Sequence, residues 1–167
     1  MIFATVGTQV HFDRLIQAVD EWAGTSGRRD VFAQTGPSSY LPKYIEAKPF
    51  IDPDEFRARM AAATIVIGHA GMGSILTALE FGKRIIVMPR RSDLGEHRND
   101  HQVATAKYYG SQGRIVVAQD ERELIDKLQQ LEKLDEINPI SPQASPLLIS
   151  TIRGFVESPQ SSVRQVA

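Results

Sequence analysis

Cysteine is absent from the 167-residue sequence, which excludes disulfide scaffolds, cysteine metal sites and thiol nucleophiles. No apolar run is long enough to cross a bilayer, and no basic and apolar leader precedes the first apolar run, Ile2–Val6. The formal net charge of −1 at pH 7 leaves no basic surplus to attract nucleic acid or anionic lipid. We therefore expect a cytoplasmic protein without a signal peptide, a membrane span or a nucleic-acid partner.

Two common nucleotide-binding motifs are missing as well. The pattern Gly-x-x-x-x-Gly-Lys-Ser/Thr does not occur, which argues against a P-loop nucleoside triphosphatase. The pair Gly71 and Gly73 is not followed by a third glycine at the spacing of dinucleotide-binding proteins, and it lies in mid-chain rather than after the first strand. An NAD-binding domain is therefore disfavoured.

Short apolar runs alternate with amphipathic segments along most of the chain. They predict strands at 2–6, 30–35, 47–51, 65–67, 84–88 and 114–118, and helices at 12–22, 52–63, 75–81, 99–109 and 120–134. Strands and helices that alternate at this spacing form parallel sheets through right-handed crossovers. We expect an α/β protein with one Rossmann-like domain over 1–137, helices on both faces of its sheet, a linker over 138–146, a C-terminal helix over 147–157 and a flexible tail over 158–167.

The segment Thr64–Ser74 combines a strand, a glycine-rich turn and a helix start. A β-branched run ends at Gly68, a histidine and two glycines follow, and Ser74 opens an apolar helical pattern. Free N–H groups in the first turn of a helix bind anions, and glycines let the backbone approach a phosphate closely. The pattern predicts a phosphate site, and a tight turn without a ligand is the alternative. The histidine could bind the phosphate or, alternatively, cap the helix that follows. The expected contacts are His69, Gly71, Met72, Gly73 and Ser74.

Two further turns follow predicted strands at the same edge of the sheet. In the turn 6–9, Gly7 and Thr8 are candidates for contact with a phosphate or an acceptor, although Thr8 as a plain helix cap explains the pattern equally well. Gln34 and Gly36 belong to a short polar turn after the second strand. His11 is an outside candidate for a catalytic base, and a surface histidine is the simpler interpretation.

The segment Pro89–Gln102 is a polar loop between a strand and a helix. Ligands of open α/β sheets bind at the carboxyl ends of the strands, where this loop and the glycine-rich turn both lie. The loop is therefore a second candidate for ligand contact, with a solvated charged connection as the alternative. We expect no metal, because its histidines and acids lack a known ligand spacing. These residues are Asp93, Glu96, His97 and His101.

Several of these segments together resemble the C-terminal, donor-binding domain of family 28 glycosyltransferases. The likeness is carried by residues 68–82, 83–89 and 99–102, and also by 5–8, 12–16 and 34–36. It extends in order from residue 1 to about 135. The sequence resembles stand-alone versions of this domain more closely than the domain within longer enzymes. Such stand-alone versions serve as subunits of a bacterial exopolysaccharide transferase and of a eukaryotic transferase that adds N-acetylglucosamine to a dolichol-linked sugar.

The resemblance implies one half of a GT-B enzyme that is divided between two chains. This half would bind a UDP-sugar without a metal ion or other cofactor. A membrane-associated subunit would bind the acceptor, a lipid-linked saccharide, and would recruit this chain to the inner face of the cytoplasmic membrane. We expect the helix at 147–156 to dock on that partner, and a homodimer is the alternative for the isolated chain.

The resemblance also suggests residue roles. His69 and the turn that follows it would contact the donor diphosphate. Thr77 stands where the family usually has an acid for the ribose, and the nearest acid is Glu80, one helical turn further on. Asp100, His101 and Gln102 would contact the donor sugar. Arg90, Arg91 and Arg98 would surround it and favour the carboxylate of glucuronic acid, unless they are solvated or bind phosphate.

The reaction implied is an inverting sugar transfer in exopolysaccharide synthesis. A base would deprotonate the acceptor hydroxyl, which would attack the anomeric carbon as UDP leaves. We expect the base to come from the partner subunit. The competing hypothesis is a non-catalytic nucleotide-binding module or an assembly factor.

Overall fold

The computed structural model describes residues 1–131, 139–141 and 143–157. The strands are β1 (Ile2–Thr5), β2 (Val31–Gln34), β3 (Glu46–Lys48), β4 (Ile65–His69), β5 (Arg84–Met88) and β6 (Val116–Val117). The helices are α1 (Asp13–Ser26), α2 (Pro53–Ala62), α3 (Met72–Glu80), α4 (His101–Ser111), α5 (Glu121–Leu128) and α6 (Pro146–Glu157). The predicted alternation of strands and helices is therefore confirmed.

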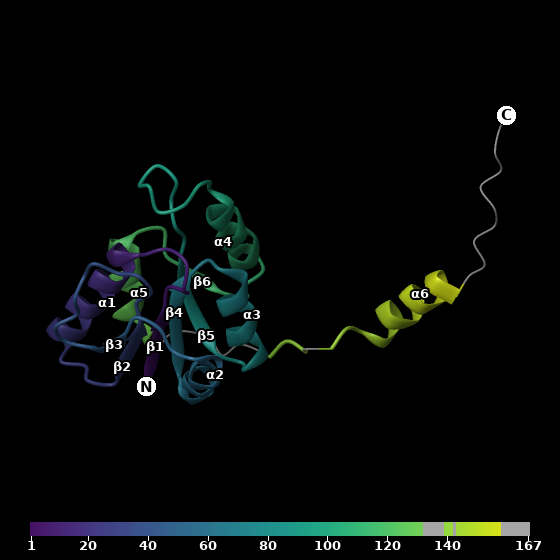
Figure 1. The fold of residues 1–167 in the computed structure, drawn as a ribbon, viewed down its shortest axis with the longest axis horizontal. Helices are drawn as coiled ribbons and strands as arrows, with labels where there is room; N and C mark the ends of the chain where they lie inside the picture. Colours follow the sequence, from purple (N-terminus) through teal and green to yellow (C-terminus); the bar gives the residue numbers. More distant parts are fainter. Residues whose placement is uncertain (132–138, 142, 158–167) are drawn as a thin grey trace.

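The described strands form one parallel sheet in the order β3-β2-β1-β4-β5-β6 (Figure 1). Central β1 pairs with β2 through Ala4 and Ala33 and with β4 through Ala4 and Ile67. The chain thus builds outward from β1 to β3, returns to the other side of β1 and builds outward again to β6. Loops diverge at this reversal, so a crevice forms outside the carboxyl ends of β1 and β4.

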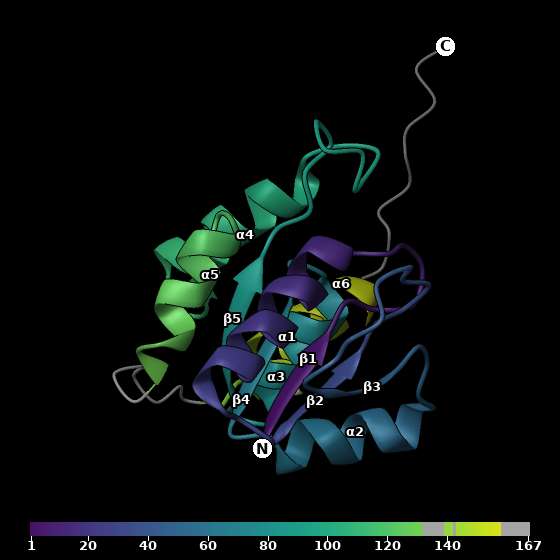
Figure 2. The same cartoon turned by 90° about the vertical axis from the view of Figure 1, so that its left-hand side faces the viewer.

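Both faces of the sheet are buried, as the unbroken apolar strands predict. Along β1, Ile2 and Ala4 belong to a core with α1 and α5, whereas Phe3 belongs to a core with α2, α3 and α4. Figure 1 shows α1 and α5 on one side of the sheet and α2 and α3 on the other, and Figure 2 looks onto the sheet from the side of α1. The predicted Rossmann-like domain with helices on both faces is confirmed.

Some element boundaries differ from those predicted. Helix α3 begins two residues before Ser74, because Gly71 takes the N-cap position and its carbonyl accepts a hydrogen bond from the Ile75 N–H at 3.1 Å. Thr8 is not a helix cap, since α1 begins only at Asp13. Strand β6 has two residues rather than five, in part because the chain is still leaving α4 at Arg114, whose N–H bonds to the Tyr109 carbonyl.

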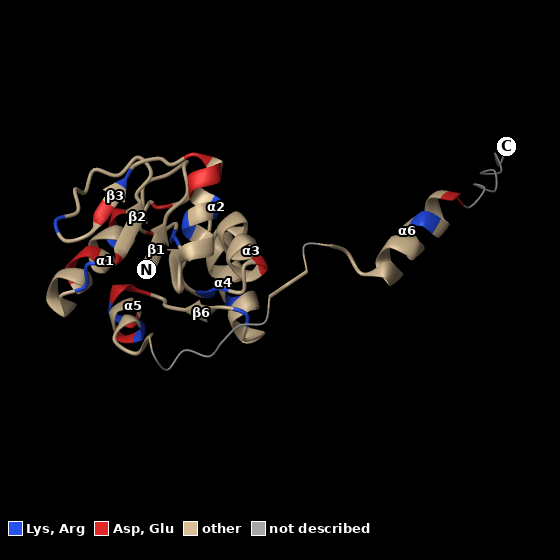
Figure 3. Ribbon diagram, turned by 90° about the horizontal axis from the view of Figure 1, so that it is seen from below, with Lys and Arg blue, Asp and Glu red and all other residues tan. Residues whose placement is uncertain are grey.

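The last described helix, α6, stands apart from the domain (Figure 1), and none of its residues is buried. It carries one basic and one acidic residue, Arg153 and Glu157, on an otherwise uncharged helix (Figure 3). Residues 132–134 of the predicted fifth helix, part of the linker at 138 and 142, and the tail over 158–167 lie outside the described residues. Within the described part, no helix has the length and apolar character needed to cross a membrane.

Asp20 connects α1 to the segment before β3. Its buried carboxylate accepts hydrogen bonds from the backbone N–H groups of Lys43, Tyr44 and Ile45 at 2.9, 2.8 and 3.1 Å, and from the Tyr40 hydroxyl at 2.8 Å. Burial raises the pKa of Asp20, but these hydrogen bonds outweigh burial and hold the pKa below its ordinary value. One carboxylate thus orders a segment that forms no regular structure.

We predict that Asp20→Asn lowers the free energy of unfolding by about 2 kcal/mol, because an amide NH₂ then faces a backbone N–H donor. The whole difference in the free energy of unfolding between the wild type and the variant should be present at pH 7. It should shrink below about pH 4, because a carboxylate with a lowered folded pKa loses its stabilisation as pH falls through that pKa. Urea unfolding at several pH values measures both effects. Exposed Asp126→Asn is the matched control, and an equal loss there would contradict the account.

Candidate functional site

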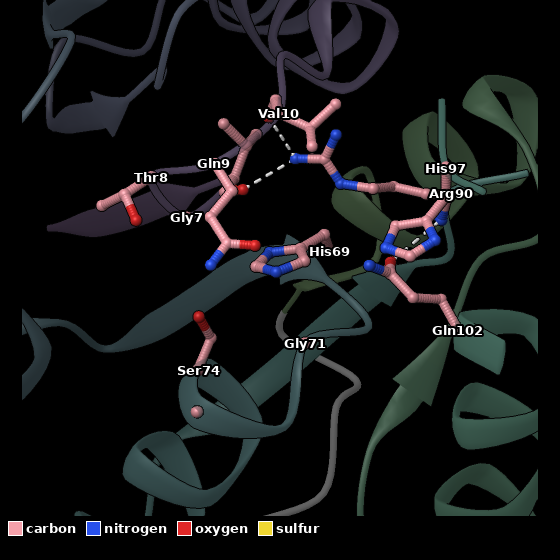
Figure 4. A pocket seen from close by; sticks show the side chains of 12 residues that line it. Gly7, Thr8, Gln9, Val10, His69, Gly71, Ser74, Arg90, His97 and Gln102 are labelled. Atoms are coloured by element: carbon pink, nitrogen blue, oxygen red, sulfur yellow. Dashed lines mark hydrogen bonds between the residues drawn. The ribbon is translucent and has the colours of Figure 1, made fainter. Parts of the chain in front are cut away.

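A polar hollow opens at the crevice where the strand order reverses (Figure 4). Its volume is about 260 Å³, and it lies among the β1–α1 loop, the β4–α3 turn and the segment after β5. Open α/β sheets bind their ligands at this position. The polar hollow is lined by Val6, Gly7, Thr8, Gln9, Val10, His69, Gly71, Gly73, Ser74, Arg90, His97 and Gln102.

The imidazole of His69 lies between two glycine turns. Gly7 has a φ of +76°, which side chains rarely adopt, and a Cβ there would lie 3.1 Å from Cε1 of His69. A Cβ on Gly71 would overlap Nε2 of His69. Both positions therefore need glycine if the imidazole is to occupy this place. The structure brings the predicted residues His69, Gly71 and Gly7 together at one wall of the polar hollow.

The environment keeps His69 uncharged. Burial lowers its pKa to about 4, nearby Arg90 and His97 act in the same direction, and a hydrogen bond with the Thr5 backbone opposes them. At neutral pH the ring therefore has one N–H donor and one acceptor nitrogen. A neutral imidazole can donate one hydrogen bond to an anion, and His69 lies beside the first-turn N–H groups of α3, which have no partners within their own helix.

The structure gives Arg90 a role in holding the β1–α1 loop. Its side chain is 2% exposed, and its guanidinium donates to the carbonyls of Val6 and Val10 at 2.8 and 2.6 Å and to that of His11. The guanidinium also lies over the Phe12 ring, 4.9 Å from its centroid. Carbonyls of one loop accept three hydrogen bonds from its guanidinium, so Arg90 shapes the β1–α1 loop. It also lines the polar hollow, and its contact with a donor sugar stays a prediction.

The loop after β5 is fixed by ion pairs. Arg14 of α1 donates to Glu96 at 2.7 and 2.9 Å and to Glu121 of α5 at 3.0 Å. Glu96 is buried and also accepts a hydrogen bond from the Arg91 N–H at 3.0 Å. The alternative of a fully solvated loop is therefore wrong at Glu96, although most of the loop is exposed. Glu96 anchors the loop next to His97, which lines the polar hollow.

The predicted sugar contacts Gln102 and His101 have different positions. Gln102 is buried, lines the polar hollow, and accepts a hydrogen bond from the Arg90 N–H at 3.2 Å. His101 is exposed and bonds to Asn99, and its ring packs edge-on against His97 with 4.4 Å between centroids. His101 thus supports a residue of the hollow and does not line it.

Arg91, Asp100 and Arg98 do not line the polar hollow. Arg91 pairs with Asp93 at 2.6 Å, and together with Asp100 they line a separate hollow of about 400 Å³. Asp100 accepts a hydrogen bond from the Ser92 N–H at 2.9 Å. Arg98 is exposed, and none of the residues that the structure describes forms a hydrogen bond or ion pair with it. Of the three arginines, Arg98 alone keeps a guanidinium without a partner inside the described chain.

An apolar hollow of about 330 Å³ adjoins the polar one. Gly7, Thr8, Gly73 and Ser74 line both, so the two form one groove across the ends of β1 and β4. The remaining walls are Gln34, Ile51, Pro53, Phe56 and Thr77. Mostly apolar surfaces with a few polar groups are typical of sites for small ligands.

The predicted ribose contact, Thr77, lines the apolar hollow, and its hydroxyl donates to the Gly73 carbonyl at 2.8 Å. Glu80 is occupied elsewhere, because it pairs with Arg57 at 3.5 Å. Gly36 does not line either hollow, but a Cβ on it would lie 3.0 Å from the Gly7 carbonyl oxygen. It therefore gives the β1–α1 loop room to turn.

Other predicted candidates lie outside the groove. Met72 is the first residue of α3 and its side chain is exposed, so any contact with an anion would use its backbone N–H, one of the first-turn donors of the helix. The His11 side chain is exposed and does not line the polar hollow. Its role as a base stays a prediction. Within the described residues, no group of three or more histidines and acids could hold a metal ion.

Sequence reasoning missed four residues of the polar hollow, which are Val6, Gln9, Val10 and His97. His97 drew attention only as a potential metal ligand, and its spacing did not support that role. The apolar wall of Ile51, Pro53 and Phe56 was also missed. A signal was present, since a proline-led helix start after a strand predicts a turn at the ligand-binding edge of the sheet.

Comparisons with known proteins agree with this architecture. The model of the glycosyltransferase family 28 C-terminal domain matches residues 1–145. The human protein named "UDP-N-acetylglucosamine transferase subunit ALG13" is 30% identical over 124 residues, which are 68% of this chain and 10% of that protein. The mouse protein of the same name is 30% identical over 123 residues. The chain thus spans about a tenth of the length of these curated relatives.

Solved structures share the fold. The solution structure of ALG13 is 19% identical, with a TM-score of 0.58 over 90% of this chain and 93% of that one. The Os79 protein of O. sativa, solved with UDP, is 19% identical, with a TM-score of 0.59 over 80% of this chain and 32% of that one. MurG of Acinetobacter baumannii is 17% identical, with a TM-score of 0.57 over 78% and 41%. The domain therefore corresponds to one half of a GT-B fold.

We predict that Gly71→Ala displaces the His69 ring from its place between the two turns. The displaced ring should become more hydrated, so that its pKa rises from about 4 toward the ordinary value of histidine. Proton NMR titration of the imidazole measures this change. Gly73→Ala is the matched control two residues away, because a Cβ there would meet nothing within 4 Å. An unchanged His69 pKa in the Gly71 variant would refute the close packing of the His69 ring between the two glycine turns.

Proposed function

The chain belongs to the glycosyltransferase family 28 C-terminal domain family, and we propose that it is the donor-binding subunit of a two-component inverting glycosyltransferase. The observation that carries this proposal is the polar hollow at the N-terminus of α3, between two glycine turns at the reversal of the sheet. Such a site suits the diphosphate of a UDP-sugar, because helix N-terminal N–H groups and glycine backbone favour a close anion.

The adjoining apolar hollow supports a nucleotide in one orientation. With the diphosphate at Gly73 and Ser74, which line both hollows, a planar base would reach the apolar wall of Ile51, Pro53 and Phe56. The ribose would then lie near the Thr77 hydroxyl. The sugar would point to the other end of the groove, toward His97 and Gln102.

The transfer itself needs groups from a second subunit. A base on the partner would take the proton of the acceptor hydroxyl, whose oxygen would attack the anomeric carbon while the bond from that carbon to the diphosphate breaks. The charge that develops on UDP would be stabilised by the first-turn N–H groups of α3 and by His69. No metal ion is required in this scheme.

The name of the ALG13 relatives, a transferase subunit, supports a partner. The large exposed side chains of α6 supply apolar surface for it, among them Leu147, Ile152 and Phe155. We propose that the partner is membrane-associated and binds a polyprenyl-linked acceptor of exopolysaccharide synthesis. It would bring this chain to the inner face of the cytoplasmic membrane.

For the donor sugar we propose glucuronic acid. Support for the carboxylate comes from Arg98, the exposed arginine of the loop that has no partner among the described residues and is adjacent in sequence to His97 of the polar hollow. Arg90 and Arg91 give less support, because carbonyls accept hydrogen bonds from the first and Asp93 pairs with the second. The ALG13 relatives suggest UDP-N-acetylglucosamine as the competing donor.

The competing function is a non-catalytic nucleotide-binding module or assembly factor. It shares the UDP site and differs only in the transfer. An assay on membranes from cells that co-express the chain with its acceptor-binding subunit distinguishes the enzyme from the binding module. Release of UDP from a UDP-sugar supports the enzyme, whereas binding of UDP without release supports the module.

We predict that Ser74→Asp weakens binding of UDP to the full chain at least tenfold and abolishes UDP release by the complex. The new carboxylate repels the diphosphate, while an acid in the first helical turn remains compatible with folding of α3. Titration calorimetry measures the affinity. Ser150→Asp, the same change on exposed α6, is the control. A wild-type chain that fails to bind UDP at millimolar concentration would overturn the donor-binding proposal.

We also predict that Arg98→Gln lowers the ratio of the rates with UDP-glucuronate and UDP-glucose about tenfold, because the substitution removes a guanidinium that would bind the carboxylate through two hydrogen bonds. Arg91→Gln is the control, since that arginine already pairs with Asp93. Initial rates of UDP release with each donor measure the preference. Equal use of both donors by the wild-type complex, or preference for UDP-glucose or UDP-N-acetylglucosamine, would refute the uronate.

A further inference from the structure

Helix α6 presents an apolar stripe that its own domain leaves uncovered. None of its residues is buried, and Figure 1 shows the helix apart from the sheet and the helices that cover it. With 3.6 residues per turn, most of its large apolar side chains fall on one face, whereas Ser150 and Glu157 fall on the opposite face. The stripe consists of Leu148, Ile149, Ile152, Phe155 and Val156. Because an isolated helix of 12 residues is marginal in water, the stripe calls for a partner surface.

An apolar groove lies at the edge of the sheet, between α4 and β6. Its volume is about 370 Å³, and none of its lining residues lines the polar hollow. One wall contains Val103, Ala106 and Gly110, which repeat at helical spacing along one face of α4. The other wall contains Ile115 and Val117, which alternate along the segment of β6. Strand β6 is the last in the described order of the sheet, so this α4–β6 groove is accessible from the edge.

The stripe and the α4–β6 groove match in length and character. The α4 wall extends from Val103 to Ser111 and the stripe from Leu148 to Val156, and each covers about 12 Å at a helical rise of 1.5 Å per residue. Among the described residues that line the groove, Lys107 alone is charged, and a lysine can lie along a rim with its ammonium in water. An amphipathic helix that lays its apolar face into such a groove is a common mode of recognition.

The link before α6 favours the groove of a second copy. The Ile140 N–H donates to the Leu79 carbonyl at 3.1 Å, so the chain is still attached to its domain at that residue. Pro139 and Pro146 bracket the link to α6, and proline stiffens such links. A stiff link that holds α6 away from its own domain, as in Figure 1, makes the helix available to a neighbouring molecule. Every copy carries both the helix and the groove, so two copies can exchange helices and close into a symmetric dimer.

We propose that the chain forms a two-fold dimer in which α6 of each copy packs its apolar stripe into the α4–β6 groove of the other copy. This inference does not depend on the proposed function. The acceptor-binding subunit proposed above would compete for the same stripe, so the dimer is the form of the chain without that subunit.

Sedimentation equilibrium of the full chain measures the association, and the wild type should be a dimer at micromolar concentration. Ile152→Asp puts a charge into the stripe and should raise the dimer Kd at least about tenfold, because the carboxylate would lose its water in the groove. Ser150→Asp is the matched control on the opposite face and should leave the Kd within about twofold. Neither side chain is buried, so both variants should keep the circular dichroism of the wild type.

A second pair of variants tests the groove itself. Ser111→Trp fills the groove with an indole ring and should also raise the dimer Kd about tenfold. Gln112→Trp is the control at the next residue, which does not line the groove, and should dimerise normally. Both positions are exposed, so the two variants should fold alike.

Crosslinking identifies which copy supplies the helix. The sequence has no cysteine, so introduced thiols report proximity without background. A mixture of the Lys107→Cys and Ile152→Cys chains, treated with a bismaleimide, should give a two-chain product, and Ser150→Cys in place of Ile152→Cys should give much less.

A monomeric wild type would overturn the dimer, whether or not a chain with both cysteine substitutions crosslinks within itself. A dimer that persists in Ile152→Asp would overturn the role of the stripe. A dimer that is lost in Ile152→Asp but persists in Ser111→Trp would show that the helices pair elsewhere, and it would overturn the exchange into the groove.

Discussion

The buried guanidinium of Arg90 holds the site together. It joins the end of β5 to the loop after β1 by donating to three carbonyls of that loop, and it lies over the ring of Phe12. Burial lowers its pKa to about 10, partly offset by Glu96, so it remains charged at neutral pH. Within the described residues no carboxylate bonds to it, so its positive charge is oriented but not cancelled beside the polar hollow.

Much of the fold follows from local patterns in the sequence. Apolar runs of strand length that alternate with amphipathic segments specify a parallel sheet, because the period of the apolar residues decides between strand and helix. The glycine turn after β4 was predictable too, because a strand, two glycines and a helix start follow one another in the sequence. The structure adds the reason for Gly71, since a Cβ there would overlap the His69 ring. Boundaries were less predictable: the cap of α3 is Gly71 and not Ser74, because a helix cap depends on backbone geometry as well as on side-chain preference.

The parts of the site that could not be predicted depend on partners distant in sequence. Arg90 reads as a ligand-binding arginine in a polar loop, and only the fold reveals that carbonyls about eighty residues away occupy it. Arg14 and Glu96 are likewise paired across the domain. His97 has the same difficulty, because its neighbours in sequence suggest a charged surface while its neighbours in space form the polar hollow. The sequence indicates which edge of the sheet binds a ligand, but it does not indicate which charged side chains at that edge lack a protein partner.

These charges suggest why the chemistry would be divided between two proteins. The polar hollow has helix N–H groups, a neutral His69 and the positive charge of buried Arg90, all of which stabilise negative charge. The same features oppose a strong base, because burial and, to a smaller extent, the positive charge of Arg90 lower the pKa of an imidazole placed here, as they do for His69. If the hollow receives a departing diphosphate as proposed, it would be poorly suited to take a proton from an acceptor. In the proposed function, placing the base on a separate surface would remove the conflict, and that surface would approach the end of the groove at His97 and Gln102.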